Sequence, residues 1–373
     1  MLKSSIILRL YFLFIGALIV QSNFAQAVRI PGSTNYPSSA GRSIGASSIE
    51  VKWNAPGVKG RQDQIWGTNI AWYGFQVLGF GSNVESPWRA GADECTTISF
   101  STDVMINGKP LPAGKYAFFI ALYADSSVLI FNKNTTEWGS YFYRKDLDVM
   151  RVATTQVKNN AFQERLNYTF YDQSEDKVML ALDWEKWRIP MTIQVDLKKT
   201  ILADLRKQMD GAIGFDPPSL QAAASWCEQN DVNLEEGLSW INSATDPNLG
   251  GINNFPTLSV KAKLLSKMGK ANEAKAIMDQ AMDVATTIEL HQYGRRLLAE
   301  KKVDEAVRVF EKNFTKYNGA WPTQVGLMRG YSAKGDLKKA LEHARLAAAQ
   351  APDEVNKKSL ENSIKSLEAG KAL

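Results

Sequence analysis

The chain has 373 residues, enough for two or three domains that each bury a core of their own. Its formal net charge is +5, which becomes +3 if Lys3 and Arg9 are removed with an amino-terminal signal. This mild charge, without a basic stripe and interleaved aromatic residues, excludes a nucleic-acid partner from our predictions. The composition, 45% hydrophobic and 22% charged, is that of an ordinary globular protein.

Residues 1–27 have the features of a secretory signal peptide. Lys3 and Arg9 give a positive start, Leu10–Val20 is apolar, and Ala25-Gln26-Ala27 is a small-x-small cleavage site. The alternative is a membrane anchor, but the apolar run is short for a bilayer and ends in a polar stretch. We therefore expect an exported protein, periplasmic or secreted, with no membrane span after signal cleavage.

Residues 47–197 are predicted to form an antiparallel β-sandwich or barrel, preceded by a flexible lead-in over residues 28–46 that is rich in Ser, Gly and Pro. Strict alternation of polar and apolar residues begins at Ser48–Trp53. Asn107-Gly108 suits a tight turn because both positions tolerate positive φ, and Pro110 and Pro112, on either side of Leu111, should break a strand or sit on an edge. The other predicted strands are Thr97–Phe100, Val104–Ile106, Tyr116–Leu122, Val128–Asn132, Val149–Val157, Arg165–Tyr171, Val178–Trp184 and Arg188–Val195.

The hydrophobic period becomes helical at about Leu197. We predict a helix over Leu197–Met209 and a connector between domains over residues 198–218. The two cysteines, Cys95 and Cys227, then fall in different domains. Even in an oxidising compartment, two buried free thiols are expected rather than a disulfide.

Residues 219–373 contain a degenerate repeat. A short turn is followed by a small residue at Ala274, Ala306 and Ala340, which lie 32 and 34 residues apart, and an earlier copy spans Asn230–Gly237. This pattern resembles the tetratricopeptide repeat, a helix-turn-helix unit of about 34 residues. The resemblance implies an α-solenoid of helix pairs, with Asp353–Leu367 as its capping helix. The whole chain is therefore predicted to be an α+β multidomain protein.

The β region carries short motifs in a consistent order. They are Arg61, Ile65-Trp66-Gly67, Trp88-Arg89-Ala90-Gly91-Ala92-Asp93-Glu94, Thr96-Thr97, Asp103-Val104, Ile106-Asn107-Gly108, Leu111-Pro112-Ala113-Gly114-Lys115-Tyr116, Phe131-Asn132-Lys133, Trp138-Gly139, Arg151-Val152 and Trp184-Glu185. With these motifs, residues 45–197 resemble the exported bacterial family called domain of unknown function 2911. The resemblance implies an all-β fold and export, but no reaction. Asp93, where the family usually has Asn, and the long segment Gly74–Pro87 depart from the family pattern.

Two groups of residues could form a ligand site in the β region. Arg89, Asp93 and Glu94 combine a guanidinium with carboxylates, which suits an anionic or sugar ligand, or an ion pair that fixes a loop. The second group combines the residue types that form carbohydrate sites, although its Trp residues could equally belong to the core. Its members are Asn132, Lys133, Trp138, Trp184 and Glu185. Glu94 and Glu185 could in principle serve as a glycosidase pair.

No catalytic constellation is evident. The only histidines, His291 and His343, lie in the helical region and are expected to face solvent, so the β region can hold neither a His-based metal site nor a Ser-His-Asp arrangement. Gly79-Phe80-Gly81 lacks the features of a phosphate-binding loop. No cofactor and no metal are predicted, and the sequence favours a non-catalytic protein while leaving an enzyme open.

Two functions remain open. The first is a non-catalytic binding or assembly protein of the cell envelope that holds a protein or peptide partner through residues 219–373. Basic residues that could lie on that surface are Lys261, Lys267, Arg295, Arg296 and Arg329. The alternative is a carbohydrate-binding or glycan-processing protein, acting on an envelope glycan through the region of Arg89, Glu94, Trp138 and Glu185.

Overall fold

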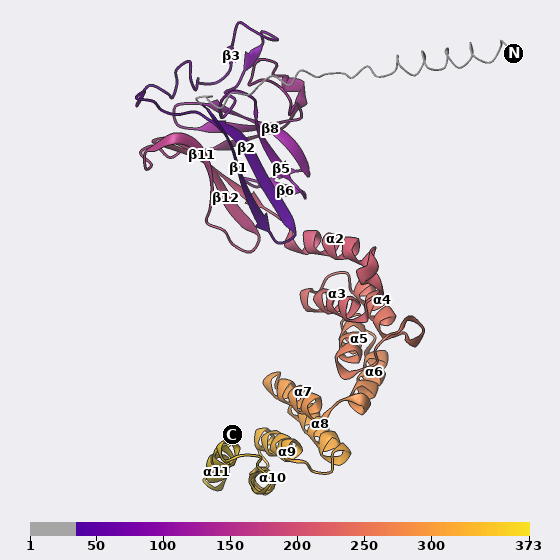
Figure 1. The fold of residues 1–373 in the computed structure, drawn as a ribbon. Coiled ribbons are helices and arrows are strands. Elements are labelled where there is room, and N and C mark those ends of the chain that lie inside the picture. Colours follow the sequence, from indigo (N-terminus) through magenta and orange to yellow (C-terminus); the bar gives the residue numbers. More distant parts are fainter. Residues whose placement is uncertain (1–34) are drawn as a thin grey trace, which may run out of the picture. The chain divides into compact units, whose positions relative to one another are not determined.

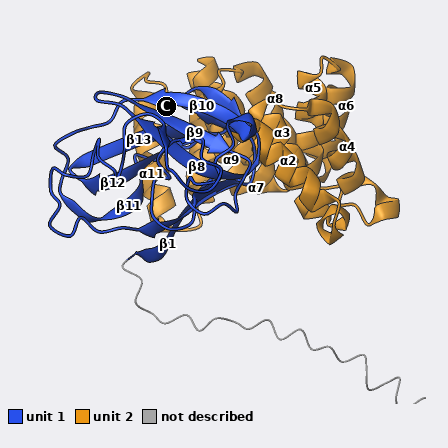
Figure 2. Cartoon of the chain, turned by 90° about the horizontal axis from the view of Figure 1, so that it is seen from above, with its two compact units in different colours: residues 1–195 blue, residues 196–373 orange. Residues whose placement is uncertain are grey.

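The structure is a computed structural model that describes residues 35–373; the predicted signal segment and the first residues of the lead-in lie outside this range. The chain divides into two compact units, residues up to Val195 and Asp196–Leu373 (Figure 2). The first unit is built from antiparallel sheets and the second from helices. The predicted α+β multidomain class is therefore confirmed.

The first unit is a β-sandwich of two antiparallel sheets (Figure 1). One sheet has six strands in the order β1-β2-β5-β8-β9-β10, and the other has five in the order β11-β12-β13-β6-β7. A separate hairpin, β3–β4, lies in the long segment Gly74–Pro87. The strands are β1 Tyr36–Ile44, β2 Ser47–Ala55, β3 Gln76–Val77, β4 Glu85–Ser86, β5 Thr96–Phe100, β6 Val104–Ile106, β7 Lys109–Leu111, β8 Gly114–Leu122, β9 Ser127–Asn132, β10 Asp148–Thr154, β11 Gln163–Tyr171, β12 Lys177–Glu185 and β13 Trp187–Gln194.

The six-stranded sheet has side chains packed on both of its faces. Side chains along β5 and β8 are buried almost continuously instead of alternating. Trp53, Phe118 and Tyr168 pack with ring centroids 5.0 to 6.3 Å apart in one aromatic group. A second apolar cluster joins Cys95 and Phe119 to Tyr143, which belongs to the segment between β9 and β10. Loops therefore cover part of this sheet, and the signature region lies among them.

The predicted lead-in was wrong from Tyr36 onward, because residues 36–44 form strand β1. This strand pairs with β2 in an unbroken register from Tyr36 opposite Ala55 to Ile44 opposite Ser47. It lies at the edge of its sheet, and most of its side chains are exposed. Because most of its side chains are exposed, no face of the strand has to be apolar, and its sequence shows no apolar alternation.

The predicted turn and edge are confirmed at β6–β7. Asn107 and Gly108 both have positive φ, at 46° and 78°. Pro110 lies in β7, which is the edge strand of the five-stranded sheet. Proline lacks the N–H that a central strand would need, so an edge position is the one it tolerates.

The second unit is an array of helices. They are α2 Leu197–Met209, α3 Pro217–Asn230, α4 Leu234–Thr245, α5 Phe255–Lys267, α6 Ala271–Val284, α7 Thr287–Ala299, α8 Val303–Lys316, α9 Trp321–Lys334, α10 Leu337–Ala349 and α11 Glu354–Glu368. The predicted connector helix α2 belongs to this unit, because Met209 packs against the apolar cluster that contains Leu220 and Ile241. Within residues 35–373, no helix has the length and apolarity needed to cross a membrane.

The helix pairs have the features of tetratricopeptide repeats. Ala274, Ala306 and Ala340, the small residues predicted at each helix approach, are all buried. The turn before each of them holds one residue with left-handed φ: Gly269, Lys301 and Gly335 respectively. Helix α11, with Asp353 as its N-cap, closes the array where a capping helix was predicted.

Close packing around Phe310 joins three of these helices. Phe310 on α8 is fully buried. A Cβ added at Gly326 on α9 would lie 2.5 Å from its ring, and one at Gly330 would lie 3.0 Å away. Glycine is therefore required on α9 because the aromatic ring occupies the space of a side chain.

The cysteines and histidines differ in how well they were predicted. Cys95 and Cys227 are buried free thiols in different units, as predicted, and burial raises the pKa of each to about 11. The expectation that the histidines face solvent was wrong, because both are half-buried. His291 Nδ1 lies 2.9 Å from the Pro322 carbonyl oxygen, and the His343 ring stacks on Tyr331. Burial lowers the pKa of both.

Candidate functional site

The signature segment between β4 and β5 is a loop held by main-chain hydrogen bonds. Trp88 and Ile120 of β8 exchange both of their main-chain hydrogen bonds. The carbonyl oxygen of Ala90, a residue with φ of 51°, accepts hydrogen bonds from Thr96 Oγ1 (3.1 Å) and Tyr168 Oη (2.8 Å). Left-handed alanine is uncommon, and these two buried hydroxyls stabilise it. They fix the orientation of the loop that carries Arg89 and Asp93.

Arg89 is held without an ion pair. Its Nη1 donates to the main-chain oxygen of Asp93 (3.0 Å), and its guanidinium lies 5.3 Å from the centre of the Tyr141 ring. A Cβ at Gly139 would lie 2.5 Å from the same nitrogen. Within the described residues, the predicted alternative of an ion pair between Arg89 and a carboxylate is not formed. The guanidinium is instead fixed by a carbonyl, a ring and a glycine.

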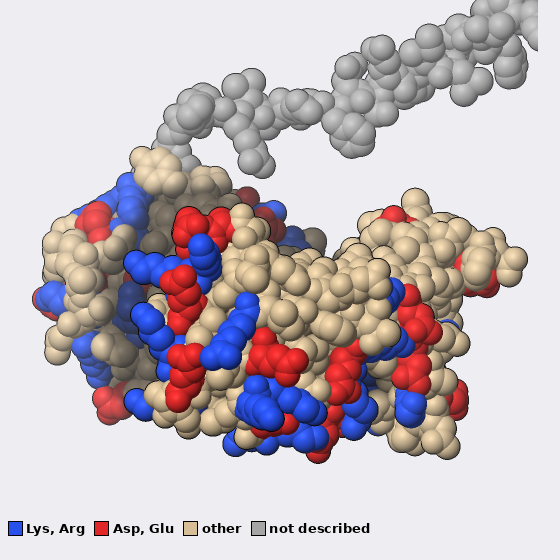
Figure 3. Space-filling view, turned by 90° about the horizontal axis from the view of Figure 1, so that it is seen from below, with Lys and Arg blue, Asp and Glu red and all other residues tan. Residues whose placement is uncertain are grey.

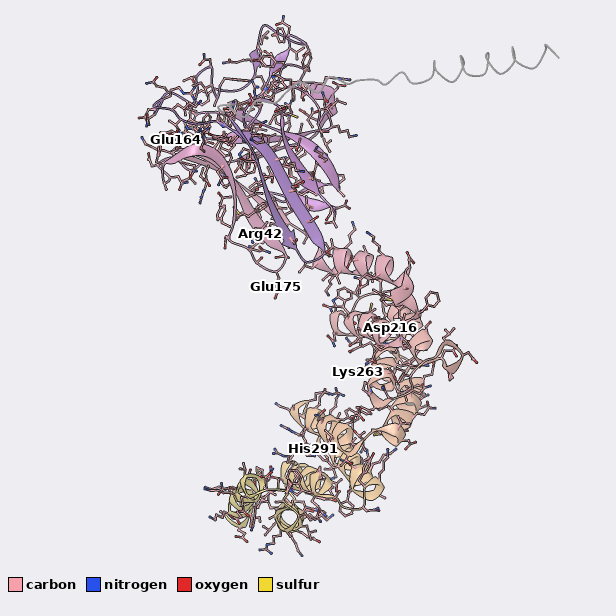
Figure 4. All side chains as sticks on the ribbon, viewed as in Figure 1. Arg42, Glu164, Glu175, Asp216, Lys263 and His291 are labelled. Carbon is pink, nitrogen blue, oxygen red and sulfur yellow. The ribbon has the colours of Figure 1, made fainter. Side chains whose placement is uncertain are left out.

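Arg89, Asp93 and Trp184 line one pocket of 590 Å³, within the size range of small-molecule sites. Its other lining residues are Asn35, Pro56, Gly57, Lys59, Arg61, Ile70, Gly91 and Ala92. The main-chain N–H of Lys59 donates to Glu164 Oε1 (3.0 Å), and Glu164 is labelled at one end of the β domain in Figure 4. Arg42 and Glu175 mark the opposite end (Figure 4). The pocket therefore lies at the Glu164 end of the sandwich.

A group of tryptophans stands behind the pocket. Trp184 is 1% exposed and lies parallel to Trp88, with ring centroids 6.1 Å apart. Trp66 contacts both rings edge-on and stacks on Trp187 at 4.6 Å. The indole N–H of Trp184 is buried and finds no acceptor among the described residues. A buried donor of this kind normally has a hydrogen-bond partner.

The other predicted site residues do not line this pocket. Glu94 is exposed and accepts a hydrogen bond from Asn54 Nδ2 (2.6 Å). Glu185 is buried in the β12–β13 turn, where its Oε2 accepts from the Lys186 main-chain N–H (2.7 Å). These placements give no support to the glycosidase pairing of the two glutamates.

The remaining three candidates lie at the end of β9 and in the segment that follows it. Asn132 is fully buried, and its amide donates to the Arg144 carbonyl oxygen and to Asp148 Oδ1. Lys133 is exposed, and Trp138 is 52% exposed. Asn132 therefore supports the segment that contains Gly139. The proposed carbohydrate set of Arg89, Glu94, Trp138 and Glu185 contributes only Arg89 to the pocket.

Lys59 and Arg61 are pocket residues that the sequence-based site prediction missed. Arg61 Nε and Nη2 donate to the carbonyl oxygens of Val58 (2.9 Å) and Gly57 (2.8 Å), which close the loop after β2. Arg61 is one of the family motif residues, so the sequence contained an indication of its role. Lys59 carries no such signal, and only the folded loop places it beside Arg89.

Glu137 is a buried acid on the same segment as Gly139. It is 5% exposed, and neither of its carboxylate oxygens has a hydrogen-bond partner among the described residues. Burial, with a smaller contribution from the Asp148 charge, raises the pKa of Glu137 to about 7. Its main-chain oxygen accepts the Cys95 N–H at 3.3 Å. Glu137 therefore links the signature loop to the segment behind Arg89.

The helical unit contains a groove of 920 Å³ between the α5–α6 pair and the α7–α8 pair. Helix α3 packs on α5 and α7 packs on α9, but α5 and α7 are in much looser contact. Met278, Met282 and Tyr293 lie in the widened space together with Leu297 and Val309. Methionine side chains adapt their shape to different apolar partners, so this lining suits a peptide.

The groove carries more basic than acidic residues. Seven basic residues line it, including Lys263 of α5 (labelled in Figure 4), against four acidic ones. The lysines are partly compensated: Lys275 pairs with Asp279 at 2.7 Å, and Lys302 with Glu300 at 2.7 Å. Arg308 and Arg296 form no ion pair within residues 35–373. The Arg296 guanidinium lies 5.1 Å from the centre of the Tyr293 ring.

On the face drawn in Figure 3, acidic and basic side chains are interspersed rather than gathered into a large patch of one sign. Of the basic residues proposed for the helical surface, Lys267 and Arg296 line the groove, whereas Lys261, Arg295 and Arg329 do not. The groove thus combines an apolar floor with two guanidiniums that lack acidic partners.

Residues 36–193 match the family described as "Protein of unknown function (DUF2911)". Among solved structures, MamA from Desulfovibrio magneticus RS-1 is 16% identical, with 41% of this chain and 94% of that chain covered at a TM-score of 0.25. A tetratricopeptide repeat protein from Parabacteroides merdae ATCC 43184 is 14% identical, with 47% and 69% covered at a TM-score of 0.28.

A search of curated proteins gives no match. The tetratricopeptide character of the second unit rests on its own helix pairs, turns and buried small residues. Residues 36–193 of this chain thus match the DUF2911 family model, and an array of tetratricopeptide-type helix pairs follows them.

Proposed function

We propose that this is an exported, non-catalytic binding or assembly protein of the cell envelope, whose helical repeats hold a protein or peptide partner. The observation that carries the proposal is the groove between the α5–α6 and α7–α8 pairs. A solenoid of helix pairs offers such surfaces to peptides as a rule. Export is supported by the sequence of residues 1–27, with its basic start, apolar run and small-x-small site.

The chemistry of the groove selects an acidic, amphipathic partner segment. Met278, Met282 and Val309 offer apolar contacts, while Arg296 and Arg308 offer guanidinium donors that form no ion pair within residues 35–373. Guanidiniums bind carboxylates in a bidentate manner, so Glu or Asp side chains of the partner would supply the missing charge. Opposite charge across an interface also speeds association and rejects basic segments.

The experiment measures binding of synthetic amphipathic helical peptides to residues 28–373 by fluorescence anisotropy. Peptides with Glu along the polar face are expected to bind, and the same peptides with Lys instead of Glu are not. An Arg296→Ala/Arg308→Ala double variant should weaken binding by about tenfold or more. Arg345→Ala/Lys357→Ala on α10 and α11 removes the same charge outside the groove and should leave affinity unchanged.

Two results would contradict the groove as the partner site. One is equal binding of the acidic and basic peptides, which would show that charge plays no part. The other is an equal loss of affinity in the two double variants, which would reduce the effect to net charge. Crosslinking in an envelope extract then tests the assembly role: a physiological partner must be recovered with the wild type and lost with the groove variant.

Export has its own test. The mature protein recovered from the envelope fraction should begin at Val28, directly after the small-x-small site. A recovered chain that retains Lys3 and Arg9 and stays with the membrane would instead support the anchor alternative.

A further inference from the structure

We propose that the pocket of the β domain binds a small, hydroxyl-bearing dianion, with either a phosphate ester or two carboxylates as its charged part. This proposal is separate from the peptide groove and rests on none of its residues. It rests on charge, on the way the cations are held, and on the composition of the pocket wall.

The pocket has an uncompensated positive charge. Lys59, Arg61 and Arg89 line it against a single acid, Asp93. None of the three cations forms an ion pair with a carboxylate in the part of the chain that the structure describes. Residues 1–34 contain no Asp or Glu, so the preceding segment cannot supply the missing charge. Cations gathered in a pocket without acidic partners are an anion site, and the excess of two charges matches a dianion.

The two guanidiniums are oriented before any ligand arrives. Arg61 uses Nε and Nη2 on the carbonyl oxygens of Gly57 and Val58, and Arg89 uses Nη1 on that of Asp93. These carbonyls take up only part of the five N–H donors that each guanidinium carries, and the rest are available to a ligand oxyanion. Because the loops already hold both side chains, binding loses little side-chain entropy.

The rest of the wall selects for hydroxyl groups and size. The carboxylate of Asp93 accepts from the Asn35 amide at 3.1 and 3.2 Å and keeps lone pairs for a ligand hydroxyl. A carboxylate in the pocket also repels an anion that offers it no donor. Trp184 and Ile70 give apolar surface, and the 590 Å³ volume suits a small molecule rather than a protein segment.

Three residues in the loops around the pocket have an uncommon backbone conformation. Lys59, Ala90 and Asp93 are non-glycine residues with φ between 51° and 56°. Such conformations cost free energy and gather where a fold positions groups for a ligand. At Lys59 this conformation offers a test variant, because Asn tolerates left-handed φ well and carries no charge.

The test is isothermal titration of residues 28–373 with inorganic phosphate, glucose 6-phosphate, tartrate and glucose at constant ionic strength. We expect both hydroxylated dianions to bind, the neutral sugar not to bind, and inorganic phosphate to bind more weakly. Lys59→Asn and Arg61→Gln should each weaken the better dianion by about tenfold. Arg144→Gln, which removes an exposed cation paired with Asp146, should change affinity less than twofold.

The comparison of the two dianions identifies the oxyanion, since the tighter one shows whether phosphate or carboxylate is preferred. The proposal is overturned if no dianion binds, if glucose binds as tightly as its phosphate ester, or if Lys59→Asn and Arg144→Gln have the same effect. Lys59 is exposed, so its variant should fold, and a thermal melt equal to wild type confirms this before titration. Failure here would leave the peptide groove untouched, because the groove variants lie in the other unit.

Discussion

The pocket of the β domain and the groove of the helical array are both basic, but their cations are held in different ways. In the pocket, main-chain carbonyls of sharply turned loops hold Arg61 and Arg89. In the groove, lysines such as Lys275 and Lys302 form ion pairs at the surface with acids of their own turn or helix. Main-chain contacts fix a guanidinium, whereas exposed ion pairs of long side chains exchange easily. The first arrangement suits one small rigid ligand, and the second suits a peptide.

The largest expected effect is a loss of stability, caused by a substitution in the helices that form one wall of the groove. Phe310→Ala would leave a cavity between α7, α8 and α9, and we expect it to lower the free energy of unfolding by about 3–5 kcal/mol. Urea denaturation followed by circular dichroism measures this loss. Phe215→Ala is the control, because Phe215 is 85% exposed and its removal should have little effect.

If Phe310→Ala were tolerated as well as Phe215→Ala, the close packing of these helices would not determine the shape of the groove. Gly326→Ala tests the same contact from the other side, since its Cβ would meet the Phe310 ring. Combining it with Phe310→Leu should restore part of the stability that Gly326→Ala removes.

The pH dependence of stability tests whether Glu137 is buried in the segment behind Arg89. The unfolded carboxyl loses its proton near pH 4.5, whereas the folded one keeps it to about pH 7. Between these values the folded state binds more protons, so stability falls as pH rises through this window, by on the order of 3 kcal/mol in total. Glu137→Gln should remove that fall, as shown by urea midpoints measured across the window.

Glu164→Gln is the matched control for this pH experiment, because Glu164 is exposed. It should leave the pH dependence as it is in the wild type. A Glu137→Gln protein with the same pH slope as the wild type would mean that the carboxylate is solvated, and that the segment behind Arg89 is looser than the structure shows.

The smallest expected effect compares two glycines with similar backbone and different surroundings. Gly139 and Gly79 have φ of 62° and 71°, so alanine should cost about 1–2 kcal/mol at each. Only at Gly139 would the new Cβ meet the Arg89 guanidinium, since nothing lies within 4 Å at Gly79. Gly139→Ala should therefore also weaken dianion binding, as titration would show. Equal affinity in the two variants would show that Arg89 does not contribute to dianion binding.

The sequence predicted those features that depend on local periodicity. The strands with alternating side chains, the Asn107-Gly108 turn and the small residues at Ala274, Ala306 and Ala340 were all expected where they occur. Strand β1 was missed because an exposed edge strand is specified by pairing rather than by side chains. Arg89, Asp93 and Trp184 were chosen for their chemistry, and the fold brings these three to one pocket.

The remaining features depend on distances that a sequence does not contain. Lys59 and Trp184 are far apart in the chain and line one pocket only because β2 and β12 end at the same side of the sandwich. The groove depends on a wider spacing between two helix pairs, which no repeat motif reveals. Glu94 and Trp138 have residue types suited to a ligand site, but neither of them lines the pocket.

Strand β1 also bears on the behaviour of the protein at high concentration. A foreign strand that added to this edge would meet exposed Ser39, Gly41 and Arg42 instead of an apolar row, and Pro37 has no N–H to donate. Pro110 has the same effect on the edge strand β7 of the other sheet. The polar, exposed sequence that shows no strand pattern thus makes the β1 edge a poor template for edge-to-edge aggregation.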